Sequence, residues 1–151
     1  MKSITLFAAV ALAATAVAGS ASANHFEPKG VAYKAAGSFV IAIASADACQ
    51  AVFRGNTDAG QGASITSVTF KQPCGLIADG LPWRMATHAA DSLTIYGMSF
   101  HHIGNATMCA EDAKAQLTSL GHIVFSTELE VGFCALSGTL ITRPQLSSVG
   151  K

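Results

Sequence analysis

The sequence predicts an all-β fold, either an antiparallel β-sandwich or a barrel-like domain, cross-linked by two disulfides. Short runs of β-forming residues recur along the chain, with turn residues between them about every 8–12 positions, as is typical of such folds. His122–Phe133 alternates apolar and polar residues over its length, which indicates a sheet with one solvated face. No segment has the pattern of a crossover helix, so a parallel α/β fold is not expected.

The first 23 residues have the features of a secretory signal peptide. Lys2 precedes an apolar run from Ile4 to Val17, and Ala21-Ser22-Ala23 fits the A-x-A cleavage pattern. This run is too short and too rich in alanine to span a bilayer comfortably, and no later segment approaches that length. We therefore expect residues 1–23 to be a cleaved signal peptide and residues 24–151 to form a single β-rich exported domain.

The composition of the expected mature chain argues against a nucleic-acid partner. Charged residues make up 12% of the full sequence, about half the usual share of a globular protein. Once Lys2 is removed with the signal, eight Lys and Arg residues remain against nine Asp and Glu. Nucleic-acid binding requires a basic face, which this balance does not favour. Ser, Thr, Gly and Ala replace the charges, a composition usual for exported fibre subunits and surface-active proteins.

The four cysteines form two pairs with identical spacing. Cys49 and Cys74 enclose 24 residues, and so do Cys109 and Cys134. An even number of cysteines in an exported chain indicates disulfides, and four allow three connectivities. The equal spacing favours Cys49–Cys74 with Cys109–Cys134. In the chain-entropy account each such loop contributes about 3.5 kcal/mol. The C-x2-C clusters of zinc sites are absent, so no metal is predicted.

Eight strands are expected after the lead-in of residues 24–37, and residues 143–151 are expected to be a polar tail. The expected strands are Ser38–Ala44, Cys49–Arg54, Ala63–Phe70, Gly75–Ala78, Trp83–His88, Ser92–Phe100, His122–Phe133 and Ala135–Thr142. Residues 46–48 are expected to form a turn and residues 55–62 a loop. The pattern of residues 110–120 leaves open a strand pair or a short helical turn.

Two strands carry further expectations about their faces. In Ala63–Phe70 the apolar positions change parity, which indicates a β-bulge. In Ser92–Phe100, strict alternation groups Leu93 and Ile95 on one face and Met98 with Tyr96 on the other.

Two apolar features are candidates for contact with a partner. Trp83, the only tryptophan, is either a core anchor or an exposed contact for an apolar ligand, and its size favours the core. The nearly uninterrupted apolar run that contains Phe39, Val40, Ile41 and Ile43 is either a strand buried on both faces or a strand donated to a neighbour's sheet edge.

The remaining polar residues do not indicate catalysis. His101 and His102 are adjacent, so on a strand they point to opposite faces and cannot easily bind one ion. Asp79 and Asp91 each lie in a predicted turn, where local hydrogen bonding explains the residue type. No nucleophile elbow, zinc-protease helix, P-loop or dinucleotide fingerprint is present. The sequence therefore predicts a protein that is not an enzyme and needs no cofactor.

The layout of the chain resembles the exported bacterial family of alkane oxidation activators represented by PraB. The similarity covers Cys-x-x-x-Phe-x-Gly from Cys49 to Gly55, Ala-Ser-Ile at 63–65, and Leu-Pro-Trp at 81–83, followed by alternating strands and the late cysteine pair. His101-His102, Glu128 and Glu130 are not part of that pattern.

The resemblance implies a secreted or cell-surface protein without catalytic residues that assists the uptake and oxidation of long-chain alkanes. We expect it to act by surfactant-like contact with hydrocarbon, its expected apolar partner. The alternative is a self-associating subunit of an extracellular fibre or biofilm matrix, assembled by strand donation through the apolar run near the mature N-terminus.

Overall fold

The computed structural model describes residues 24–42, 46–71, 74–104, 108–131 and 134–150. The predicted signal peptide, residues 1–23, lies outside the described residues. The strands are β1 (His25–Glu27), β2 (Ala32–Ala42), β3 (Ala46–Thr57), β4 (Ala63–Phe70), β5 (Leu76–Ala78), β6 (Trp83–Ala89), β7 (Ser92–His102), β8 (Met108–Leu117), β9 (His122–Val131), β10 (Cys134–Arg143) and β11 (Ser147–Val149). Within these ranges, no helix is long and apolar enough to cross a membrane.

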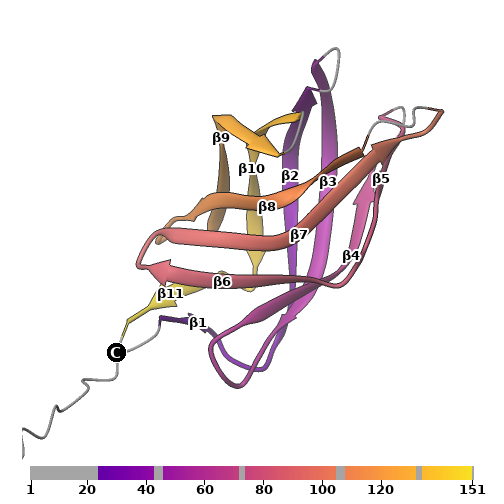
Figure 1. The fold of residues 1–151 in the computed structure, drawn as a ribbon. Helices are drawn as coiled ribbons and strands as arrows, with labels where there is room; N and C mark the ends of the chain where they lie inside the picture. Colours follow the sequence, from indigo (N-terminus) through magenta and orange to yellow (C-terminus); the bar gives the residue numbers. More distant parts are fainter. Residues whose placement is uncertain (1–23, 43–45, 72–73, 105–107, 132–133, 151) are drawn as a thin grey trace, which may run out of the picture.

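The described strands build a closed antiparallel barrel. β2, β3, β4, β6, β7, β8, β9 and β10 pair in the order of the sequence, and β10 pairs back with β2 to complete the circle (Figure 1). β5 is an addition that pairs with the end of β7. The predicted all-β fold with two disulfides is thus confirmed, and among the predicted forms the chain adopts the barrel.

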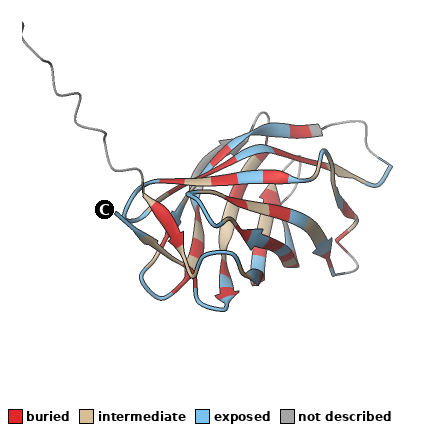
Figure 2. Cartoon of the chain, turned by 90° about the horizontal axis from the view of Figure 1, so that it is seen from below, coloured by how far each residue is buried: buried red, intermediate tan, exposed pale blue. Residues whose placement is uncertain are grey.

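The inside of the barrel is filled by the protein's own aromatic side chains. Along most of the strands buried residues alternate with less buried ones, as Figure 2 shows, so these strands send every second side chain inward. An eight-stranded barrel is just wide enough to be filled by side chains or to hold one small ligand. Here six large rings contact one another in the interior: Phe39, Phe53, Phe70, Trp83, Phe100 and Phe125.

Irregularities in β4 and β7, two of the four in the described sheet, set which side chains of these strands face inward. In β4, Arg54 pairs with Ser67 and Gly55 with Ile65, so Thr66 is the extra residue; this confirms the bulge predicted from the change of parity. β7 contains a second bulge between Ile95 and Met98.

The bulge in β7 corrects the predicted faces of that strand. Gly97 has a φ of 69°, and its N–H donates to Asp112 Oδ1 at 2.8 Å. The irregularity changes the parity of the strand, so Ile95 and Met98 are both fully buried whereas Tyr96 is exposed. The grouping of Met98 with Tyr96 on one face was therefore wrong.

Five local predictions were also wrong, each in a segment with weak turn or strand signals. One is the loop expected over residues 55–62, whose first three residues belong to β3. The lead-in already contains β1 and the first half of β2, and residues 46–48 continue β3 instead of turning. Residues 108–117 form the single strand β8, and the tail contains β11. In each case the segment pairs with a neighbouring strand that its own sequence does not reveal, and tertiary pairing overrides local propensity.

The apolar run in β2 is buried on one face only. Phe39 and Ile41 point into the barrel and are at most 1% exposed, whereas Ser38 is exposed and Val40 half-buried on the outer wall. The expectation that both faces are buried was therefore wrong, because a barrel covers only the inner face of each strand. Ile43 lies outside the described residues.

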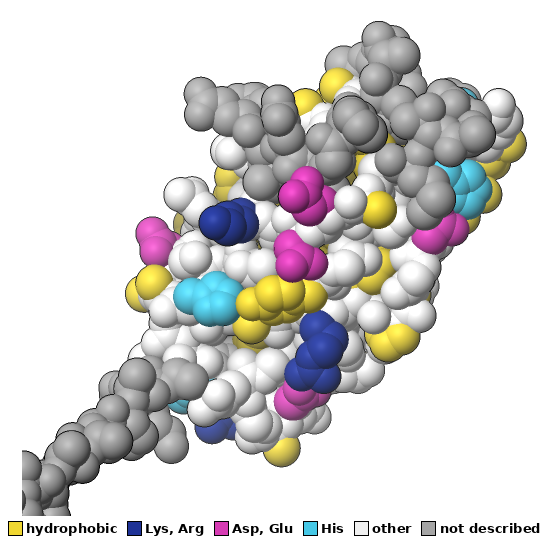
Figure 3. All heavy atoms as spheres, viewed as in Figure 1, with side chains coloured by type: hydrophobic (Ala, Val, Ile, Leu, Met, Phe, Trp, Pro, Cys, Tyr) yellow, Lys and Arg dark blue, Asp and Glu magenta, His cyan; other side chains and the backbone are white. Residues whose placement is uncertain are grey.

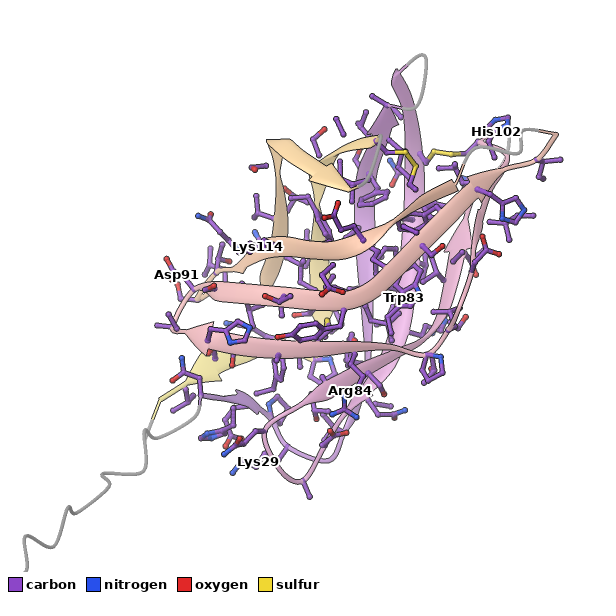
Figure 4. All side chains as sticks on the ribbon, viewed as in Figure 1. Lys29, Trp83, Arg84, Asp91, His102 and Lys114 are labelled. Carbon is purple, nitrogen blue, oxygen red and sulfur yellow. A yellow bond between two sulfur atoms is a disulfide. The ribbon has the colours of Figure 1, made fainter. Side chains whose placement is uncertain are left out.

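The two ends of the barrel are closed differently. Cys49–Cys74 and Cys109–Cys134 are both bonded, with Cα–Cα distances of 5.6 and 5.7 Å, and lie close together at the upper end (Figure 4). This confirms the predicted pairing and defines the disulfide end. At the opposite end β1 pairs with β11, and the buried side chains of Phe26 and Leu146 close the barrel.

Tyr33 gives the stability of the barrel a dependence on alkaline pH. Its hydroxyl donates to the carbonyl of Ser64 at 3.0 Å, and burial raises the pKa of the phenol well above its usual value of 10.0. Above about pH 10 the unfolded chain loses the Tyr33 proton while the folded protein keeps it, so stability falls as pH rises. At about pH 11, one unit above the usual tyrosine pKa, we expect this difference to lower the free energy of unfolding by about 1.4 kcal/mol.

Urea unfolding of the wild type and Tyr33→Phe at neutral and alkaline pH measures this effect. At neutral pH the free energy of unfolding of Tyr33→Phe is about 1 kcal/mol below that of the wild type, because the carbonyl of Ser64 loses its hydrogen bond. This difference between the two proteins becomes smaller as the pH rises. Tyr96→Phe, at a 39% exposed position, is the control for the removal of a tyrosine hydroxyl from the surface. An unchanged alkaline slope in Tyr33→Phe would contradict the prediction.

Candidate functional site

Exposed apolar side chains come together at one corner of the disulfide end. Among the described residues, the large hydrophobic side chains that are more than a third exposed are Ile77, Tyr96, Ile103, Leu120, Ile141 and Val149. Most of these lie on separate strands or turns, but Ile77 and Ile103 are close neighbours. We refer to these two side chains as the Ile77–Ile103 corner.

The pairing of β5 with β7 places both isoleucines on the outer surface. Ile77 lies opposite His101, and the N–H of Ile103 donates to the carbonyl of Gly75 at 2.8 Å. Ile77 and Ile103 are therefore diagonal neighbours on one face, a separation over which long side chains interact. They are 41% and 55% exposed.

Both disulfides adjoin the Ile77–Ile103 corner. Cys74 immediately precedes the segment that leads into β5, and Cys109 lies opposite Phe100 of β7. Phe100 in turn pairs with Ala78 at the end of β5. The segment that leads into β5 is thus cross-linked to β3, and the second bond joins β8, the strand paired with β7, to β10.

A histidine–carboxylate pair lies beside the two isoleucines. His101 Nδ1 and Asp79 Oδ2 are 2.5 Å apart, and both side chains are about one-third exposed. The backbone of Asp79 is also fixed, because its carbonyl accepts a hydrogen bond from Trp83 Nε1 at 2.7 Å and its N–H donates to Ser99. The polar groups beside Ile77 on this face are therefore held by one another.

The structure places Trp83 in the interior. The indole is 1% exposed and meets Phe100 and Phe53 edge to face, with ring centroids 5.0 and 6.0 Å away. Figure 4 shows it in the middle of the barrel. Trp83 therefore packs in the core and does not contact solvent.

The apolar run of β2 pairs within its own barrel. Residues 38–42 pair with β3 on one side and with β10 on the other. Both hydrogen-bonding edges of this segment are occupied, so its donation to a neighbouring molecule would require two strand pairs to separate.

The other polar residues considered from the sequence are dispersed. Asp91 lies in the turn before β7, and Asp79 lies beside Ser99 near its other end, so the two carboxylates are about 20–25 Å apart along the strand. Paired carboxylates for sugar hydrolysis lie within about 10 Å of each other. Among the described residues no group of three or more His, Cys, Asp or Glu side chains is placed to hold a metal ion.

The wall formed by β6, β7 and β8 has a mixed surface. Acidic, basic, histidine and hydrophobic side chains alternate across it, as Figure 3 shows. Arg84 pairs with Asp58 at 3.5 Å, and the hydroxyl of Tyr96 lies 3.1 Å from His88 Nε2. Among the described residues of this wall, Tyr96 is the one large hydrophobic side chain that is more than a third exposed, so no large apolar patch forms there.

The isoleucines of the corner were not singled out from the sequence. Ile77 belongs to a three-residue strand and Ile103 follows the predicted end of its strand, so neither has a pattern that shows which way it points. The only signal available was the proximity of both residues to turn glycines, which places them near a barrel end.

Comparison with known proteins identifies the family. Residues 1–149 match the family model described as alkane oxidation protein activator PraA/PraB-like. No curated protein and no solved structure matches the chain. The description of the family names an activator of alkane oxidation. Because the match spans nearly the whole sequence, the chain belongs to the PraA/PraB-like family of alkane oxidation protein activators.

Proposed function

We propose that this protein is a secreted or cell-surface, non-catalytic factor that promotes growth on long-chain alkanes by contacting the hydrocarbon with its exterior. The observation that carries the proposal is the filled barrel. Since aromatic side chains occupy the interior, hydrocarbon has to be met on the outside. The Ile77–Ile103 corner offers exposed aliphatic surface for that contact.

The cross-links beside the corner suit contact with an oil surface. A hydrocarbon interface favours unfolding, because it offers the core side chains an apolar environment outside the protein. Two disulfides at the same end restrict the chain there, so the corner can touch oil while the strands behind it stay paired. Disulfides also fit an exported protein, since they persist in oxidising compartments.

The interfacial activity of purified protein tests this proposal. We expect the wild type to lower the tension of a hexadecane–water interface and to stabilise a hexadecane emulsion. Ile77→Asn combined with Ile103→Asn removes about 1–2 kcal/mol of apolar contact, which corresponds to roughly tenfold weaker adsorption. Pendant-drop tensiometry over a concentration series measures the shift.

Leu120→Asn is the matched control. Leu120 is 66% exposed and lies in the turn between β8 and β9, at the end away from the disulfides. Its replacement leaves adsorption unchanged if the corner is the contact. Equal loss in both variants would show that any exposed aliphatic residue serves. In cells, we expect deletion of the gene to slow growth on hexadecane but not on a water-soluble carbon source. If the deletion strain grows normally on hexadecane and the purified protein has no interfacial activity, the proposal is refuted.

The fibre alternative assigned the donated strand to the apolar run of β2. Both edges of that run are paired inside the barrel, so we favour the interfacial role.

A further inference from the structure

Three cations lie in one row across the outer wall formed by β3, β2 and β10. Lys34 is directly opposite Arg54 on one side and directly opposite Arg143 on the other. All three side chains are exposed. The Cα atoms of directly paired residues on neighbouring antiparallel strands lie about 4.5–5.5 Å apart, so the row brings three cationic residues together with their Cα atoms within about 11 Å. We call these residues the basic row.

No carboxylate of the described residues neutralises the basic row. The ion pairs found within 4.0 Å join His25 to Glu27, Arg84 to Asp58 and His101 to Asp79. Like charges directly opposite each other on a sheet destabilise it. A nearly neutral chain that places three of its few cations in this arrangement retains an unfavourable energy that a bound anion would relieve.

An apolar row lies beside the basic row on the same outer face. Ala36 is opposite Val52 on β3 and opposite Ile141 on β10, and each of the three lies two residues away from a member of the basic row on its own strand. Ile141 is 43% exposed. Residues two apart on a strand share a face, so the two rows are side by side.

A shallow groove joins the two rows. It has a volume of about 270 Å³ and is lined by Lys34, Ala36, Ile141 and Arg143. One edge of the groove is therefore cationic and the other aliphatic. A ligand that matches both edges has an anionic head and an aliphatic chain.

We infer that this groove binds a long-chain carboxylate, with its head on Lys34 and Arg143 and the start of its chain along Ala36 and Ile141. A guanidinium group presents two parallel N–H donors that match the two oxygens of a carboxylate, and the ammonium adds a point charge. Arg54 lies outside the groove lining and strengthens the local positive potential. The choice of a carboxylate over other anions rests on the proposed function, since complete oxidation of a terminal alkane carbon gives a carboxylate.

Titration of the folded protein with decanoate, below the concentration at which it forms micelles, tests the inference. We expect saturable binding by calorimetry, and amide shifts in NMR spectra confined to β2, β3 and β10. Lys34→Gln and Arg143→Gln each weaken decanoate binding about tenfold or more, because each removes a charge-assisted contact. Lys114→Gln removes an exposed cation from β8 and is the matched control, with unchanged binding.

Ligands that carry only the aliphatic chain or only the carboxylate of decanoate separate the role of the apolar row from that of the basic row. Decanol has the same chain without the charge, and acetate has the carboxylate without the chain, so both bind at least tenfold more weakly than decanoate. Ile141→Asn weakens binding of decanoate but leaves that of acetate unchanged. The variants of the basic row remain folded and melt at or above the wild-type temperature, because they reduce repulsion between like charges.

Several outcomes would overturn the site. Decanol that binds as tightly as decanoate would remove any role for the cations, and acetate or inorganic phosphate that binds as tightly would indicate a simple anion contact. Binding only to phosphatidylglycerol vesicles would indicate a membrane-facing wall instead. Hexadecane adsorption depends on the distant Ile77–Ile103 corner, so loss of decanoate binding with intact adsorption refutes this site alone and leaves the proposed function standing.

Discussion

Replacement of Phe39 by alanine is expected to lower the free energy of unfolding by about 3–5 kcal/mol. Phe39 is fully buried at the centre of the aromatic cluster, where its ring contacts four others with centroid distances of 5.2–6.1 Å. These rings come from strands on different sides of the barrel, so they cannot easily collapse into the space left by the side chain. A typical domain has a total stability of about 5–15 kcal/mol, so the variant loses a large part of it.

Urea unfolding followed by tryptophan fluorescence measures this loss. Trp83 lies in the same cluster, so its emission reports directly on the packing. Leu120→Ala, at a 66% exposed position, is the control and is expected to change stability by less than about 0.5 kcal/mol. If the free energy of unfolding of Phe39→Ala lies within about 1 kcal/mol of the wild-type value, the barrel interior is not the close-packed core described above.

The second large effect is expected from removal of either disulfide. Each bond closes a loop of 24 residues, so the chain-entropy account assigns both the same contribution, about 3.5 kcal/mol. The paired replacements Cys49→Ser with Cys74→Ser, and Cys109→Ser with Cys134→Ser, should therefore lower the free energy of unfolding by similar amounts. Urea unfolding without reductant provides both values.

The two bonds differ in what they hold locally. The described pairing of β8 with β9 is confined to Gln116 with Val124 and Leu117 with Ile123, whereas β8 pairs with β7 along most of its length. Cys109–Cys134 connects β8 directly to β10 at the end where β8 and β9 are not paired. We expect amide hydrogen exchange in β8 to accelerate when this bond is removed, and to accelerate less when Cys49–Cys74 is removed. Equal protection of β8 in both variants would contradict this assignment.

Much of the fold could be predicted because alternation and cysteine spacing are local signals. Ala63–Phe70 coincides with β4, and even its bulge is visible as a change of parity in the sequence. The pairing of the cysteines followed from equal spacing. The closure of the sheet into a barrel did not, because the pairing of β10 with β2 joins segments about 100 residues apart that carry no mark of each other.

The candidate sites were less predictable than the fold. The size of Trp83 favoured the core, and the indole is indeed buried in the aromatic cluster. The basic row was invisible because Lys34, Arg54 and Arg143 are far apart in the sequence and become neighbours only through the register of three strands. Contacts of this kind depend on registers that a single sequence does not specify, since a shift of one residue would send each side chain to the other face.

The pairing of β1 with β11 has a practical consequence for experiments on living cells. His25 lies opposite Val149, so the first and last described strands are adjacent and lie at the end of the barrel away from the disulfides. A fluorescent reporter or affinity tag fused after the C-terminus would project from that end, with the Ile77–Ile103 corner facing the opposite way. A tether to the cell at the same terminus would likewise present the corner outward, toward an approaching oil droplet.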